Sequence, residues 1–438
     1  MDRHRNRAND WRLTERKIQT VTPSGTNHSW RATGLGSSGN AGERSAPSAR
    51  NAFCSRPNRP SAPILQRRVR KMRNLFPKTF LVTCIAVGAL WAGTLHAQVA
   101  DFVQVNLVSD IPGLAKITEP ELVNPWGVSH STTSPFWTSN QGTSTTTVFA
   151  VTDRTNVTKV TALNPPTGNI AIPKTATGPQ GPTGQVANTN TSSFAVNNGG
   201  DGKSALFIFA NLNGTISAWD TGPTAFIQVT TPGAVYTGLA INGAQTRLYA
   251  ANGAGTGGVD VFDSTFAPLS LAADAFVNPA LPDGLVPFNV RDIGGNVYVA
   301  YAPAGRANQT SAPLGAGAVA IFDEDGNFIT QLITGSRLAA PWGMTLAPAG
   351  FGRFINHLLV GNFSFRHSEI NAFDPTTGKH RGTIRINVGK GHTPGGLWAL
   401  DFGVGGNNGD PNTLYFTDGI NGELNGLFGA IFANGNGS

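Results

Sequence analysis

Short apolar segments recur along residues 102–438 and are separated by Gly, Asn, Asp and Pro. Each segment is rich in β-branched or aromatic residues, a composition typical of strands, and no long stretch keeps the spacing of an amphipathic helix. One kind of segment occurs six times: PWGVS (125–129), SFAVN (193–197), TGLAI (237–241), PFNVR (287–291), PWGMTL (341–346) and LWALDF (397–402). The pattern predicts an all-β fold built from a repeated unit.

Further strand-like segments follow each of these six. In the first unit they are FWTSN (136–140) and TTTVFAVT (145–152), and weaker fourth segments occur elsewhere, as in NFITQLI (327–333). Aligned on Trp126, Phe194, Thr237, Phe288, Trp342 and Trp398, the units are spaced by 68, 43, 51, 54 and 56 residues. Four strands at this spacing are typical of the blades of a β-propeller, so we predict a six-bladed β-propeller of four-stranded blades.

The last unit has only three strand-like segments before the chain ends. The segment FVQVNLV (102–108) precedes the first unit and has no place in it. We therefore expect this N-terminal strand to complete the last blade, which closes the ring and removes an exposed sheet edge. Two alternatives stay open: a seven-bladed propeller with an irregular blade inside residues 153–192, and a pair of β-sandwiches.

Three long motifs extend the segments: NLVSDIPGLAKITEPELVNPWGVS (106–129), PWGMTLAPAGFGRF (341–354) and GLWALDFGVGGNNGDPNTLYFTDG (396–419). With LLVGNF (358–363) and INAFDPTTG (370–378), they closely resemble a bacterial family of secreted, uncharacterised propellers that is distantly similar to NHL-repeat propellers. The resemblance covers about residues 102–432. It implies a six-bladed fold and export from the cytoplasm, and it implies no particular activity.

The first hundred residues have a different character. Residues 72–97 combine a basic start, an apolar run from Phe80 to Leu90 and a small residue at Ala97, which predicts a secretory signal peptide; a buried core helix is the alternative. Residues 1–71 are basic and lack apolar periodicity, so we expect this segment to be disordered. We also expect that translation starts at Met72 and that the start at Met1 is a mis-assignment. The alternative is a basic tail that contacts RNA or anionic lipid. Residues 98–438 are then a single propeller domain.

Charge and cysteine content separate along the same boundary. Residues 1–71 carry 15 basic and 4 acidic side chains, whereas residues 98–438 carry 15 basic and 21 acidic ones. The propeller domain is therefore acidic, and we expect no nucleic-acid partner. Both cysteines, Cys54 and Cys84, precede residue 98, so the domain has neither a disulfide nor a thiolate ligand.

Familiar catalytic motifs are absent from the propeller sequence or are better explained as turns. GAGTGG (253–258) matches GxGxxG but leads into a strand instead of a helix, and DEDGN (323–327) lacks the distal Glu of a calcium loop. We interpret both as hairpin turns. Among the five histidines, His392 lies in KGHTPGG (390–396) just before an inner strand. It is either a solvated loop residue or an acid–base group at the channel mouth.

A periodic polar set ends the second segment of each unit: Asn140, Asn211, Asn252, Tyr301, Asn362 and Asp418. These side chains either stabilise their own turns by local hydrogen bonds or converge as a ring of oxygens. In the second case they would suit a polar ligand or Ca²⁺, although no cofactor is established by the sequence and metal content stays open.

Aromatic and charged residues mark the inner segments. Trp126, Trp342 and Trp398 recur at one position and either pack between blades or line the channel, where they would stack on a sugar or an aromatic ligand. Arg291 and Asp401 stand where charge is scarce, as channel residues or as halves of a structural pair.

Two classes of function follow. The first is a non-catalytic binding or scaffold protein for an extracytoplasmic protein, glycan or small polar ligand. The second is a metal-assisted lactonase-, esterase- or lyase-type enzyme, with Ca²⁺ or Zn²⁺ at the channel mouth. We expect a secreted or periplasmic monomer without a stable membrane span after signal removal.

Overall fold

The computed structural model describes residues 101–435. Within this range nearly all regular structure is β, from β1 (Phe102–Ser109) to β25 (Leu427–Ala433), with two short helices, α1 (Arg306–Thr310) and α2 (Ile420–Glu423). No helix of this part of the chain is long and apolar enough to cross a membrane. The predicted basic segment (1–71) and signal peptide (72–97) lie outside the described residues and stay predictions.

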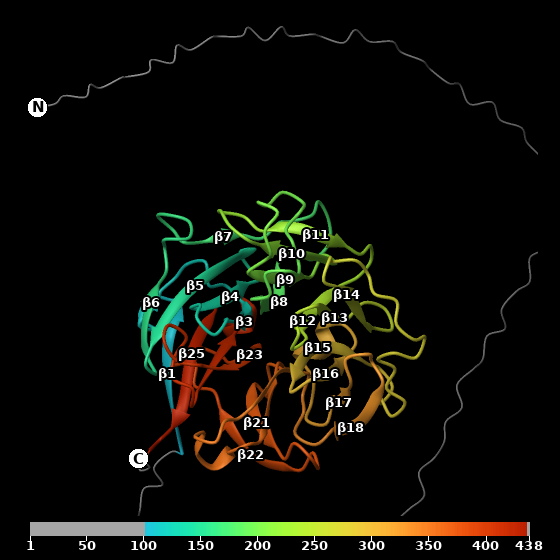
Figure 1. Ribbon diagram of the computed structural model, residues 1–438. Coiled ribbons are helices and arrows are strands. Elements are labelled where there is room, and N and C mark those ends of the chain that lie inside the picture. The colour runs from blue at the N-terminus through green and yellow to red at the C-terminus, as the bar shows by residue number, and fades with distance from the viewer. Residues whose placement is uncertain (1–100, 436–438) are drawn as a thin grey trace, which may run out of the picture. The chain divides into compact units, whose positions relative to one another are not determined.

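The strands form six sheets around a ring, as Figure 1 shows, and this arrangement confirms the six-bladed propeller. Blade 1 contains β3 (Pro125–Ser129), β4 (Phe136–Asn140), β5 (Thr145–Thr152), β6 (Asn156–Lys159) and β7 (Ile170–Ala171). Blade 2 contains β8 (Pro182–Ala187), β9 (Phe207–Asn211), β10 (Thr215–Trp219) and β11 (Phe226–Thr230). Blade 3 contains β12 (Tyr236–Ile241), β13 (Arg247–Asn252) and β14 (Gly258–Asp263).

The second half of the ring repeats this order. Blade 4 contains β15 (Leu285–Ile293), β16 (Asn296–Pro303), β17 (Ala318–Phe322) and β18 (Phe328–Thr334). Blade 5 contains β19 (Pro341–Leu346), β20 (Leu358–Asn362), β21 (Glu369–Phe373) and β22 (His380–Arg385). Blade 6 contains β23 (Leu397–Phe402), β24 (Thr413–Asp418), β25, β1 and β2 (Ile117–Thr118). The first strand of each blade lies next to the axis and contacts the first strands of both neighbouring blades.

The N-terminal strand closes the ring as predicted. β1 pairs antiparallel with β25 from Phe102 opposite Ala433 to Ser109 opposite Leu427, with one bulge. In Figure 1 the two strands lie side by side at the edge of blade 6. The seven-bladed alternative is wrong, because residues 153–192 supply β6, β7 and β8 to blades 1 and 2 instead of a further blade.

The inner strand of blade 2 differs from the sequence prediction. It is β8, whereas residues 193–197 lie in the connection between β8 and β9 and form only an isolated bridge, Ala195 to Ser204. The apolar character of this segment has another cause, because Phe194 is fully buried and its ring packs 5.1 Å from that of Phe266.

Blade 3 is the most irregular blade. After β14 the chain runs through residues 264–284 without a further strand, and it stays beside β14 through an isolated bridge from Phe262 to Pro268 and a hydrogen bond from Leu269 N to Val261 O at 2.8 Å. Three prolines in this segment lack the N–H that a continuous ladder needs. The outer position of blade 3 is thus covered without a regular strand.

Small residues at the third position of the inner strands let neighbouring blades approach closely. A Cβ at Gly127 would lie 2.5 Å from Thr183 O, one at Gly184 would lie 2.2 Å from Leu239 N, and one at Gly343 would lie 2.2 Å from Trp398 O. All six inner strands also carry a bulge at this point. The ring can therefore close tightly around its axis only with these glycines.

Candidate functional site

The central channel is closed at its waist. Between the inner strands the open space amounts to about 20 Å³, lined by residues such as Gly127, Gly184 and Gly343. This is room for about one water molecule. The two mouths of the channel are therefore separate sites, and no ligand passes from one to the other.

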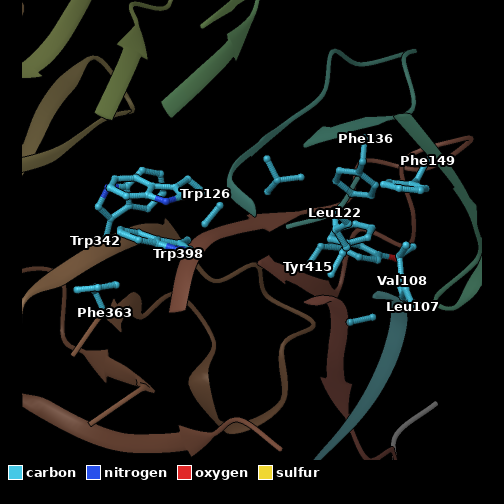
Figure 2. Packing of buried hydrophobic residues seen from close by; sticks show 14 of the residues in the cluster. Leu107, Val108, Leu122, Trp126, Phe136, Phe149, Trp342, Phe363, Trp398 and Tyr415 are labelled. Carbon is cyan, nitrogen blue, oxygen red and sulfur yellow. The ribbon is translucent and has the colours of Figure 1, made fainter. Parts of the chain in front are cut away.

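Three tryptophans plug the channel on one side of the waist. Trp126 stacks on Trp398 with ring centroids 3.5 Å apart, and Trp342 meets both rings edge-on at 6.2 and 5.5 Å. Figure 2 shows the three side chains gathered together, with Phe363 beside them. All three are at most 3% exposed. The sequence left open whether these residues pack as core or line the channel. In the structure they pack against one another inside the channel, and their ring faces offer little surface to a sugar.

The indole N–H groups of the plug are not equally satisfied. Trp342 Nε1 donates to Thr237 O at 2.8 Å and Trp398 Nε1 donates to Asn124 Oδ1 at 2.9 Å. Trp126 Nε1 is buried and has no hydrogen-bond partner among the described residues. An unpaired buried donor is costly, because it has lost its hydrogen bonds to water without replacing them.

A guanidinium covers the plug. Arg306, at the start of α1 in the β16–β17 connection, lies 4.2 Å above the ring centre of Phe363 and 5.3 Å from those of Trp126 and Trp398. Its partner is Glu423 of α2, so the pair joins blades 4 and 6 across the mouth. Burial lowers the pKa of Arg306, and the attraction of Glu423 opposes that shift.

Glu423 is held in an unusual backbone conformation. Its φ is +70°, in the left-handed region that costs a non-glycine residue about 1 kcal/mol. Asn124 Nδ2 donates to Glu423 Oε1 at 3.0 Å and to Gln141 Oε1 at 2.7 Å, while Asn124 Oδ1 receives the bond from Trp398. Backbone strain of this kind is concentrated at functional sites.

Beside this pair lies a cavity of about 440 Å³, here called the Arg306 pocket. Its lining residues are Asn124, Trp126, Gln141, Pro179, Leu212, Val235, Thr237, Gly253, Phe288, Gly305, Arg306, Gln309 and Glu423. Gln309 is 7% exposed, and its side-chain amide has no hydrogen-bond partner among the described residues. Arg306, Gln309 and Glu423 were not found from the sequence, because they lie in connections without periodicity.

The polar residues at the ends of the second strands form hydrogen bonds mainly within their own blades. Asn140 donates to Thr145 and Thr147, and Asn211 donates to Thr215 and Ser217, all within their own blades. Asn252 likewise donates to Asp260, and Asn362 donates to Arg337 O at 2.8 Å in the approach to its own blade. Burial raises the pKa of Tyr301. The hydrogen bonds recorded for these side chains do not link one blade to another.

Asp418 is the only acid in this set, and like the Tyr301 hydroxyl it is buried without a hydrogen bond in the described part of the chain. It is fully buried, and neither carboxylate oxygen has a hydrogen-bond partner among the described residues. Burial raises the pKa of Asp418 to about 7, and the charge of Glu423 adds to the shift. The backbone of Gly395 and the side chain of Ser368 lie near enough to oppose it. Asp418 is therefore a buried acid that ionises near neutral pH.

The opposite mouth brings two of the sequence candidates together. Arg291 Nη2 lies 2.8 Å from Asp401 Oδ1, so these residues form an ion pair. His130 Nε2 lies 3.8 Å from Asp401 Oδ2 and 2.9 Å from Phe402 O. These side chains line a cavity of about 280 Å³, here called the Asp401 mouth.

His392 lies in neither cavity. Its Nδ1 is 3.1 Å from Asn421 Nδ2, in the connection between β22 and β23. Among residues 101–435 no group of three or more His, Cys, Asp or Glu side chains is close enough together to hold a metal ion. The GAGTGG and DEDGN segments are the β13–β14 and β17–β18 hairpin turns that the sequence predicts.

Comparison with known proteins shows which sequences this chain resembles. No family model matches the chain. The chain is 29% identical to an uncharacterised protein of Acanthamoeba polyphaga mimivirus over 336 residues, which span 74% of this chain and 78% of that protein. A second uncharacterised mimivirus protein is 29% identical over 297 residues, 65% of this chain and 74% of that protein. These viral relatives do not support the bacterial origin that the resemblance implies.

Two solved structures are also similar. One is a protein of unknown function from Bacteroides caccae (15% identity, 48% of this chain, 61% of that chain, TM-score 0.29). The other is the nidogen/laminin complex (13% identity, 63% of this chain, 85% of that chain, TM-score 0.38). Both scores are below 0.5, too low for the likeness to bear on function. The chain is therefore a six-bladed propeller, and the two viral proteins to which it is similar are uncharacterised.

Proposed function

We propose that this propeller is a non-catalytic binding protein and that the Arg306 pocket holds its ligand. The observation that carries the proposal is the cavity of about 440 Å³ at one channel mouth, where an unpartnered amide and a guanidinium stand among apolar walls. Ligand sites in proteins are typically cavities of about 300–1,000 Å³ of this mixed character. The family resemblance, which implies export, supports a further part of the proposal, that the protein acts outside the cytoplasm.

The chemistry of the pocket favours a neutral ligand that carries an amide. The charges of Arg306 and Glu423 balance, so an ionic ligand would leave one charge uncompensated. The free amide of Gln309 both donates and accepts, as does the amide of a ligand, and Arg306 has further N–H groups beyond its bond to Glu423. Leu212 and Val235 would contact a methyl group. An N-acetylated sugar of a glycan combines these features.

A matched pair of sugars tests the proposal. Methyl N-acetyl-β-D-glucosaminide and methyl β-D-glucoside differ only in the acetamido group. We expect the first to bind the full chain and change the tryptophan fluorescence, because Trp126 lies in the pocket wall. The glucoside should produce no such change.

Variants locate the binding. Gln309→Ala and Arg306→Gln should each weaken binding about tenfold or more, since each removes a hydrogen-bonding group from the pocket wall. Arg381→Gln is the matched control, because Arg381 pairs with Asp374 at a distant β21–β22 turn. Equal fluorescence responses to both sugars, or binding unaffected by both pocket variants, would rule out this site.

A further inference from the structure

The Asp401 mouth has hydrogen-bonding groups that the protein itself does not use. Asp401 Oδ1 accepts from Arg291 at 2.8 Å and from the backbone N–H of Phe402 at 3.1 Å. Asp401 Oδ2 accepts no hydrogen bond, because the possible donor His130 Nε2 is 3.8 Å away. The Asp401 side chain is 13% exposed, so this oxygen is held in a nearly buried position.

Donors lie next to that free acceptor. Arg291 uses one nitrogen on Asp401, and its side chain is 36% exposed to the cavity. Its planar guanidinium has five N–H groups in a fixed arrangement, and most of them remain available. The mouth therefore presents a carboxylate oxygen and guanidinium N–H groups side by side.

The charges around the mouth favour a neutral ligand. Arg291 and Asp401 form an ion pair, so their charges compensate each other. Asn242 is already paired, because its side chain donates to Glu324 and accepts from the backbone of Thr246 and Arg247. A cation at Asp401 Oδ2 would lie beside the Arg291 guanidinium, and an anion at Arg291 would lie beside the Asp401 carboxylate, so either ion would meet a like charge.

We propose that the Asp401 mouth is a second binding site, for the vicinal diol of a neutral sugar. One hydroxyl of such a diol donates to Asp401 Oδ2 and the adjacent oxygen accepts from Arg291, so both unused groups are satisfied together. The cavity of about 280 Å³ has apolar walls at Val186, Leu239 and Ile241 and ends at the closed waist. It therefore suits one sugar ring rather than a chain threaded through the propeller.

Saturation-transfer NMR on the full chain tests this site. The probes are methyl α-D-mannopyranoside and methyl β-D-galactopyranoside, which carry cis-diols, and cyclohexanol, which has a ring of similar size and a single hydroxyl. We expect transfer to at least one of the two sugars and none to cyclohexanol. Asp401→Asn and Arg291→Gln should each weaken sugar binding about tenfold or more, because each removes a charge-assisted hydrogen bond.

Controls separate this site from the Arg306 pocket. Arg381→Gln removes a different Arg–Asp pair, at 2.6 Å, and should leave sugar binding unchanged. Arg306→Gln should also leave it unchanged. Near-UV circular dichroism checks that each variant is folded. If Asp401→Asn does not fold, the result for Arg291→Gln decides the test. The proposal is overturned if neither sugar binds, or if only Arg306→Gln abolishes binding.

Discussion

The buried carboxyl of Asp418 makes the stability of the propeller depend on pH in an unusual direction. Most aspartates are stabilised as carboxylates in the folded state, whereas Asp418 has no partner for its charge and is fully buried. The informative perturbation is Asp418→Asn, which keeps the shape of the side chain and removes the ionisation.

The size of the effect follows from the shift in pKa. Burial raises the pKa of Asp418 from 3.8 to about 7, which corresponds to roughly 4 kcal/mol of cost when the folded protein ionises it. Below the unfolded pKa both states are protonated and no cost arises. As pH rises, the unfolded chain releases its proton first, so the folded state loses stability until pH passes the folded pKa. Between pH 5 and pH 8, Asp418→Asn should therefore gain about 3 kcal/mol over the wild type.

Urea unfolding at several pH values measures this difference directly. The wild-type free energy of unfolding is subtracted from that of Asp418→Asn at each pH, so the titration of all other groups cancels. Asp374→Asn is the control, because Arg381 lowers the pKa of half-buried Asp374 and its difference curve should be flat across this window. A flat curve for Asp418→Asn as well would show that Asp418 ionises normally, and would refute the argument from burial.

Three further predictions concern the channel. Gly184→Ala should destabilise the protein by about 3 kcal/mol or more in urea unfolding, because its Cβ would lie 2.2 Å from Leu239 N, whereas Gly243→Ala, with no atom within 4 Å, should be nearly neutral. Arg306→Gln should shift the tryptophan emission to longer wavelength, since water would reach the rings that Arg306 covers; unchanged emission would contradict the cation–π contacts. Under the binding proposal EDTA and added Ca²⁺ should leave the thermal midpoint unchanged, whereas a midpoint that falls with EDTA and recovers with Ca²⁺ would favour the metal-assisted enzyme.

The sequence predicted the fold wherever strands are apolar and turns contain Gly, Asn or Asp. It failed at β8 because Pro182 and Gly184 are typical of turns, yet the structure needs both where the inner strands approach most closely. With β8 in place, the aligned residues Trp126, Thr183, Thr237, Phe288, Trp342 and Trp398 are separated by 57, 54, 51, 54 and 56 residues, a more regular repeat than the predicted one.

The candidate sites were harder to predict. Arg291 and Asp401 stood out because charge is scarce in inner strands, but their pairing spans 110 residues and depends on ring closure. Arg306 and Glu423 lie in connections between strands, where no periodicity shows which side chains will meet. Pairing between distant connections follows from the complete ring and is not encoded in any single segment.

The closing strand β1 also affects how the protein is made. Blades 1 to 5 are each built from contiguous chain and can form in order as synthesis proceeds, but β1 pairs with β25, which is synthesised after every other described strand. Until then β1 has an unpaired edge, a known aggregation hazard, and blade 6 lacks the strand that lies between β1 and β24. Ring closure is therefore a late step, and a chain truncated before Leu427 would contain five blades and the inner half of the sixth without the strand that joins it to β1.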